Sequence, residues 1–206
     1  MSVRVKICGV TNVADAIAAV RYGADLIGLN FYPASPRCVD LPTALEIRAA
    51  IPVGVLCVGV FVNAEREYVS QVATRLTLDA IQFHGDEKEA DLMGWPCATI
   101  KAVRVRPDEP PSDWEQYPVD YLLLDTYNPG RYGGTGEAFV WERASHVPAR
   151  WMSRLILAGG LTPDNVAAAV RAVRPWAVDV ASGVESAPGR KDPEKLRAFI
   201  TNAKTA

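Results

Sequence analysis

Cys8 is the first residue of this sequence whose type and position suit chemistry. It ends an apolar run, residues 3–8, in which Arg4 and Lys6 alternate with valine and isoleucine. Side chains of a strand alternate between its two faces, so Cys8 shares a face with Arg4 and Lys6. A thiol at the end of such a strand can take part in a reaction, and the alternative is a small buried cysteine that only packs.

Polar residues also lie at the ends of three other apolar runs. Asp125 follows a tyrosine and three leucines, Gln82 and His84 alternate at the end of a second run, and Asp179 lies in a third. In parallel strands covered by helices, polar side chains with a period of two point into the sheet interior or its rim. We therefore expect these residues to meet Cys8 at one edge. The alternative is that Asp125 only hydrogen-bonds the following loop and His84 only the rim.

Two glycine-containing turns predict an anion site. One contains Gly159 and Gly160, and the other contains Ser182 and Gly183. Glycine lets backbone N–H groups approach an anion closely, and a helix N-terminus adds its positive dipole end. Two such turns after the last two strands indicate a phosphate site, although each alone could be an ordinary tight turn. A third glycine loop, 133–136, could close over a substrate or be a simple connection.

Arg37 follows a loop that Pro33 and Pro36 stiffen. A guanidinium held in this way can form a fork of two hydrogen bonds to a carboxylate. A solvent-facing arginine is the alternative.

The elements that must position these residues alternate between strand and helix along the whole chain. This pattern predicts a single α/β domain over residues 1–206, an eightfold (β/α) barrel with short loops, and leaves an open doubly wound sheet as the alternative. The fifth helix is the weakest, because prolines crowd it. We predict strands at 3–8, 26–31, 54–62, 80–84, 99–103, 121–125, 154–158 and 178–182. We predict helices at 13–22, 42–50, 64–75, 88–93, 112–117, 139–147, 163–173 and 193–203.

Composition narrows the class of ligand. A formal net charge of −2 over 206 residues provides no global field for nucleic acid or an anionic membrane, which favours a small-molecule substrate. The N-terminus has no signal-peptide pattern, and no run is long enough to span a membrane, so we expect a cytoplasmic protein. The four cysteines lie far apart without a metal-site or disulfide pattern, and each is expected to be a free thiol.

Seven segments, in order from the first strand to the last, resemble phosphoribosylanthranilate isomerases of tryptophan biosynthesis. They are Lys6-Ile7-Cys8-Gly9, Phe31-Tyr32-Pro33 with Ser35-Pro36-Arg37, Gln82-Phe83-His84-Gly85-Asp86-Glu87, Leu123-Leu124-Asp125-Thr126, Gly133-Gly134-Thr135-Gly136, Leu157-Ala158-Gly159-Gly160-Leu161 and Asp179-Val180-Ala181-Ser182-Gly183-Val184-Glu185.

The resemblance implies an Amadori rearrangement of N-(5-phosphoribosyl)anthranilate without metal or cofactor. Cys8 matches the general base of the family and Asp125 its general acid. Arg37 would hold the anthranilate carboxylate and Asp179 a ribose hydroxyl, with Gln82 and His84 also contacting substrate. The resemblance leaves the choice between monomer and homodimer open, and we expect a freestanding enzyme.

Three residues depart from the family pattern: Asn30, Glu137 and Val140. None of them is the acid or the base. The nearest alternative is the histidine-pathway phosphoribosyl isomerase, which places an aspartate at the position of Cys8. A non-catalytic phosphosugar-binding barrel is the second alternative, but it would need neither Cys8 nor Asp125.

Overall fold

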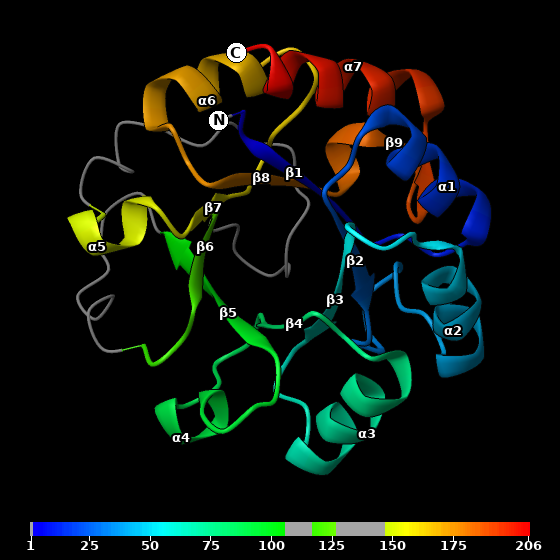
Figure 1. The fold of residues 1–206 in the computed structure, drawn as a ribbon, viewed down its shortest axis with the longest axis vertical. Helices are drawn as coiled ribbons and strands as arrows, with labels where there is room; N and C mark the ends of the chain where they lie inside the picture. Colours follow the sequence, from blue (N-terminus) through cyan, green and yellow to red (C-terminus); the bar gives the residue numbers. More distant parts are fainter. Residues whose placement is uncertain (1, 106–116, 127–146) are drawn as a thin grey trace.

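The computed structural model describes residues 2–105, 117–126 and 147–206. Within these ranges eight parallel strands close into a barrel in chain order, with helices around the outside (Figure 1). The predicted barrel is confirmed, and the open sheet is wrong. The strands are β1 (Arg4–Cys8), β2 (Leu26–Asn30), β3 (Leu56–Phe61), β4 (Ala80–Phe83), β5 (Ala98–Val105), β6 (Tyr121–Thr126), β7 (Leu155–Leu157) and β8 (Ala177–Val180). The helices are α1 (Val13–Tyr22), α2 (Leu41–Ala50), α3 (Arg66–Leu76), α4 (Glu89–Leu92), α5 (Ala149–Met152), α6 (Val166–Val173) and α7 (Pro193–Lys204).

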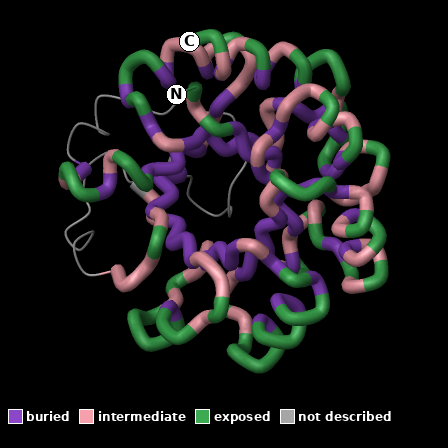
Figure 2. Tube along the Cα trace, in the orientation of Figure 1, coloured by how far each residue is buried: buried purple, intermediate pink, exposed green. Residues whose placement is uncertain are grey.

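Alternation along the strands gives the barrel two apolar layers. Side chains such as Val5 and Ile7 pack between the sheet and the helices, whereas Val58, Ile100 and Leu123 fill the interior. The ring of strands is buried almost throughout (Figure 2). Polar interior side chains therefore need partners inside the barrel, because water does not reach them.

Helix starts follow local capping chemistry. At α7 the Asp192 side chain accepts hydrogen bonds from the backbone N–H groups of Glu194 and Lys195, and Pro193 takes the first helical position, as predicted. The helix expected from residue 163 begins later, because Thr162 accepts bonds from Asn165 and Val166 in a preceding turn. That turn shortens α6 at its N-terminus.

Other differences lie between the late strands. The helices predicted at 112–117 and 139–147 fall almost entirely outside the described residues, as do the 133–136 loop, Glu137 and Val140. A short helix, α5, precedes β7, and a 3-10 turn, η2 (Ser182–Val184), follows β8. It leads into a small hairpin, β9 (Glu185–Ala187) and β10 (Arg190–Lys191), that the sequence pattern did not reveal. None of the helices in the described part of the chain has the length and apolar content that a membrane span requires.

Candidate active site

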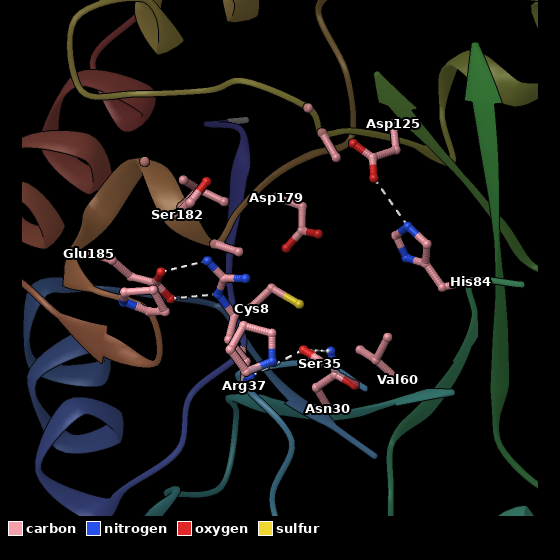
Figure 3. A pocket seen from close by; sticks show the side chains of 18 of the residues that line it. Cys8, Asn30, Ser35, Arg37, Val60, His84, Asp125, Asp179, Ser182 and Glu185 are labelled. Atoms are coloured by element: carbon pink, nitrogen blue, oxygen red, sulfur yellow. Dashed lines mark hydrogen bonds and ion pairs between the residues drawn. The ribbon is translucent and has the colours of Figure 1, made fainter. Parts of the chain in front are cut away.

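A cavity of about 720 Å³ opens at the carboxyl ends of the barrel strands. Nine of the ten predicted site residues line it, contributed by strands and loops from both ends of the chain. They are Cys8, Arg37, His84, Asp125, Gly159, Gly160, Asp179, Ser182 and Gly183. The tenth, Gln82, is fully buried beneath the cavity. Figure 3 shows Arg37 and Glu185 on one side of the cavity and His84 and Asp125 on the other.

Cys8 ends β1 beside two charged interior groups. Lys6 has no solvent exposure, and its ammonium lies 3.0 Å from the Asp179 carboxylate. A Cβ added to Gly28, the β2 neighbour of Cys8, would meet the Cys8 sulfur at 3.0 Å and Lys6 Nζ at 3.1 Å. Glycine at that position therefore leaves the space in which the thiol and the ammonium lie together.

The surroundings of Cys8 act on its ionisation in opposite directions. Burial raises the pKa of the thiol above its usual 9.0, and the nearby Asp179 carboxylate raises it further. Lys6 and Lys191 lower it, but burial prevails. In the ligand-free structure Cys8 is therefore mainly a thiol at neutral pH, and its thiolate depends on these two cations. All four cysteines are free thiols, as predicted.

Asp125, the next-to-last residue of β6, lies across the cavity from Arg37, within a short hydrogen-bonded chain (Figure 3). Its Oδ2 lies 3.1 Å from His84 Nε2, and His84 Nδ1 lies 2.9 Å from Gln82 Nε2. Asp125 is 5% exposed, so its carboxyl is largely shielded from bulk water. Gln82, expected to bind substrate, reaches the cavity only through His84.

Arg37 is held by a carboxylate of the protein itself. Its Nε donates to Glu185 Oε1 at 2.8 Å and its Nη2 to Oε2 at 2.7 Å. The same Glu185 accepts a bond from the buried ammonium of Lys191 at 2.8 Å. Among the described residues no group accepts a bond from Nη1 of Arg37. The end edge of the guanidinium, between its two terminal nitrogens, therefore stays open to a ligand.

Lys191 also ties two strand ends together. Its ammonium donates to the carbonyl oxygens of Cys8, at 2.7 Å, and Ala181, at 3.1 Å. With Glu185 these acceptors use all three of its donors. Sequence reasoning did not single out Lys191 or Glu185, because neither stands in a periodic pattern. The only sequence signal was their presence in or beside glycine-rich segments near the last strand.

Asn30 shapes the loop that carries Arg37. Its side chain accepts a bond from Tyr32 N–H and donates to the Ser35 hydroxyl, and that hydroxyl accepts a bond from Arg37 N–H. A Cβ added to Gly9 would meet Cδ of Arg37 at 2.5 Å. The departure at Asn30 therefore adds a polar brace to a loop whose arginine packs closely against the β1 turn.

The two late glycine turns lie together at the cavity wall. Gly159 and Gly160 have φ values of 82° and 65°, which glycine adopts without steric cost. Within the described ranges neither of their backbone N–H groups donates a hydrogen bond. A Cβ at Gly183 would overlap the carbonyl oxygen of Leu161, so glycine is what allows the two turns to touch. The arrangement offers backbone donors to an anion.

Comparison with known proteins places this geometry in a family. The family model for N-(5'-phosphoribosyl)anthranilate isomerase matches residues 5–202. A Pseudomonas fluorescens N-(5'-phosphoribosyl)anthranilate isomerase is 52% identical over 97% of this chain and 94% of its own. Its Thiobacillus denitrificans counterpart is 49% identical over the full length of both chains.

Solved structures agree. The phosphoribosyl anthranilate isomerase from Thermotoga maritima has a TM-score of 0.86 and 39% identity, covering 99% of this chain and all of its own. The resemblance found in the sequence is thus confirmed, and the histidine-pathway and non-catalytic alternatives are not. The chain belongs to the N-(5'-phosphoribosyl)anthranilate isomerase family and is an intramolecular isomerase of tryptophan biosynthesis.

Proposed function

We propose that Cys8 is the general base and Asp125 the general acid in converting N-(5'-phosphoribosyl)anthranilate to 1-(2-carboxyphenylamino)-1-deoxyribulose 5-phosphate. The observation that carries this assignment is that a thiol from β1 and a carboxyl from β6 line one cavity. A solved relative with a TM-score of 0.82 and 38% identity is in complex with the reduced form of that product. A substrate lying between the two groups can be protonated by one and deprotonated by the other.

In the proposed mechanism Asp125 gives a proton to the substrate and Cys8 removes one from it. Asp125 gives its proton to the ribose ring oxygen, the bond from C1 to that oxygen breaks, and the ring opens to a protonated Schiff base. The Cys8 thiolate then removes the proton from C2. The electron pair of the C2–H bond forms a C1–C2 double bond and neutralises the nitrogen, giving an enolamine that tautomerises to the ketone.

Arg37 and Asp179 orient the substrate in this proposal. The open end edge of the Arg37 guanidinium donates to the anthranilate carboxylate, while the other edge keeps its two bonds to Glu185. Asp179 binds Lys6 through Oδ1, so Oδ2 can accept a bond from a ribose hydroxyl. The backbone of Gly159, Gly160, Ser182 and Gly183 holds the phosphate.

The remaining sequence-based expectations stay predictions. They are a single domain over residues 1–206, a cytoplasmic location and a monomer or homodimer. One solved relative is described as monomers generated from a dimeric isomerase of Thermotoga maritima.

A fluorescence assay that follows loss of phosphoribosylanthranilate tests the proposal. The purified chain is expected to consume the substrate, and Cys8→Ser and Asp125→Asn are each expected to lose most turnover while still binding a reduced product analogue. Turnover in both variants close to that of the unaltered protein would show that other groups carry the proton transfers.

A further inference from the structure

Gln82, His84 and Asp125 form a hydrogen-bonded chain on the acid side of the cavity. The geometry of this chain indicates which of its atoms hold protons. Gln82 of β4 is fully buried, and its amide nitrogen lies 2.9 Å from His84 Nδ1. The other ring nitrogen of His84 lies 3.1 Å from Asp125 Oδ2. Sequence alternation aligns Gln82 and His84 on one side of β4, and the barrel brings β6 within reach.

The amide nitrogen of Gln82 determines which way the hydrogen bonds of this chain run. In this structure the amide nitrogen of Gln82 faces Nδ1 of His84, and because an NH₂ group only donates, Nδ1 is the acceptor in this arrangement. A neutral imidazole has one N–H, which then lies on Nε2 and donates to the Asp125 carboxyl. An imidazolium would bring an N–H on Nδ1 against the N–H of Gln82, and the amide would have to turn its unpartnered Oε1 to the ring to accept from it.

We propose that Gln82 is a positioning residue that keeps His84 neutral with its proton on Nε2, so that the proton needed for the acid step resides on Asp125. The inference rests on the proposed role of Asp125. It assigns Gln82 a part in the reaction that involves no contact with substrate. His84, bonded to one carboxyl oxygen, also fixes which oxygen of Asp125 faces the substrate.

Charged groups around the pair are themselves held by other partners. From β5, Arg104 donates to the His84 carbonyl oxygen at 3.1 Å, and Lys101 pairs with Glu87 at 2.6 Å beneath the following loop. Across the cavity, Asp179 pairs with Lys6. The cavity is also lined by Cys8 and by Arg37, which pairs with Glu185. The Nδ1 side of the His84 ring contacts the uncharged amide of Gln82.

A single substitution at Gln82 tests the inference. Oε1 of Gln82 is buried and has no hydrogen-bond partner among the described residues. A glutamate at this position is nearly the same size, and its carboxylate can only accept a bond. In Gln82→Glu, His84 Nδ1 must therefore carry a proton, and the imidazole is expected to become an imidazolium that draws the shared proton away from Asp125.

Nitrogen-15 NMR of the His84 ring shows directly which of its two nitrogens carries a proton. The chain has two histidines, so the variant His146→Gln assigns the His84 signals. At pH 7 we expect an unprotonated Nδ1 and a protonated Nε2 in the unaltered protein, and both nitrogens protonated in Gln82→Glu. A protonated Nδ1 in the unaltered protein overturns the proposal.

Kinetics then connect the proton state to catalysis. Gln82→Glu is expected to lower kcat at least tenfold with little change in KM. Gln82→Met, of similar size but unable to donate to Nδ1, should leave the tautomer of His84 unfixed and give a smaller loss of kcat. An imidazolium in Gln82→Glu with unchanged kcat would overturn the proposal. If Asp125→Asn instead kept full activity, the assignment of Asp125 as the acid would be wrong. The NMR experiment would still test the tautomer of His84, because it does not depend on activity.

Discussion

The two sides of the cavity hold their reactive groups by different physical means. Around Cys8 the contacts are ionic: Lys6 pairs with Asp179, and Lys191 lies between the strand ends. Around Asp125 the contacts are an amide and an imidazole, Gln82 and His84, arranged in one hydrogen-bonded chain. The proposed base lies beside full charges, and the proposed acid lies beside an imidazole and an amide.

This difference matches what each proton transfer requires. A thiol must lose its proton to act as a base, and nearby ammonium groups favour the anion that forms. A carboxyl must keep its proton to act as an acid, and a nearby cation would favour its loss. Ionic contacts suit the first task, and the absence of a cation paired with Asp125 other than the imidazole, within the described part of the chain, suits the second. The comparison predicts that substitutions on the two sides alter different steps.

Cys8→Ser should give the largest loss. A hydroxyl is a far weaker base than a thiolate, so kcat is expected to fall by roughly 10²- to 10⁴-fold while binding of a product analogue is retained. Cys38→Ser, at an exposed thiol, is the matched control. A Cys8→Ser variant within about threefold of the original kcat would remove Cys8 from the mechanism.

Asp125→Asn should produce a loss of similar order, because an amide cannot deliver a proton to the ring oxygen. We expect the fall in kcat to be roughly 10²- to 10⁴-fold. The pH profile of kcat/KM distinguishes the two sides, since each variant should alter a different limb. Profiles whose two limbs were the same in both variants would assign the titration to other residues.

Arg37→Ala should have an intermediate effect, mainly on KM. Loss of a charged hydrogen-bond partner costs on the order of 1.5–3 kcal/mol, roughly ten- to a hundredfold in kcat/KM. The analogue made from aniline lacks the carboxylate and should be affected much less. Both enzymes assayed with both substrates give a coupling energy. A coupling near zero would mean that Arg37 only braces its loop through Glu185.

Alkylation of Cys8 should depend steeply on pH. Because burial keeps the pKa of this thiol above 9.0, the thiolate fraction rises with pH, and the rate with iodoacetamide should increase about tenfold between pH 7 and 8. Peptide mapping separates Cys8 from Cys57, whose pKa burial raises to about 12 and which should stay unreactive. A rate that levels off below pH 8 would show that the two lysines outweigh burial.

Gly160→Val should have the smallest effect, seen as weaker competitive inhibition by inorganic phosphate. A bulky side chain on the turn obstructs approach to its backbone donors, and a several-fold rise in the inhibition constant is expected. Gly54→Val is the control, because Gly54 has a similarly left-handed backbone and no atom within 4 Å of an added Cβ. Equal inhibition in all three proteins would place the anion elsewhere.

Local patterns in the sequence were enough to predict the barrel and the strand ends whose side chains line the cavity. Period-two alternation placed Lys6 and Cys8 on the inner face, and the polar ends of apolar runs identified His84, Asp125 and Asp179. These inferences succeeded because strand alternation and strand ends depend on neighbours in the chain. Capping at Asp192 was predictable for the same reason, whereas α6 began later than expected because a turn of its own precedes it.

Only the tertiary structure decided which groups these residues meet. Glu185 is 148 residues from the Arg37 that it holds, and Lys191 is 183 residues from the Cys8 carbonyl oxygen that it binds. Gln82 was expected at the substrate, and the structure places its side chain below the rim, with its amide nitrogen 2.9 Å from His84 Nδ1. The contacts of Glu185 and Lys191 arise when the barrel closes and joins β1 to β8, a step that no local pattern encodes.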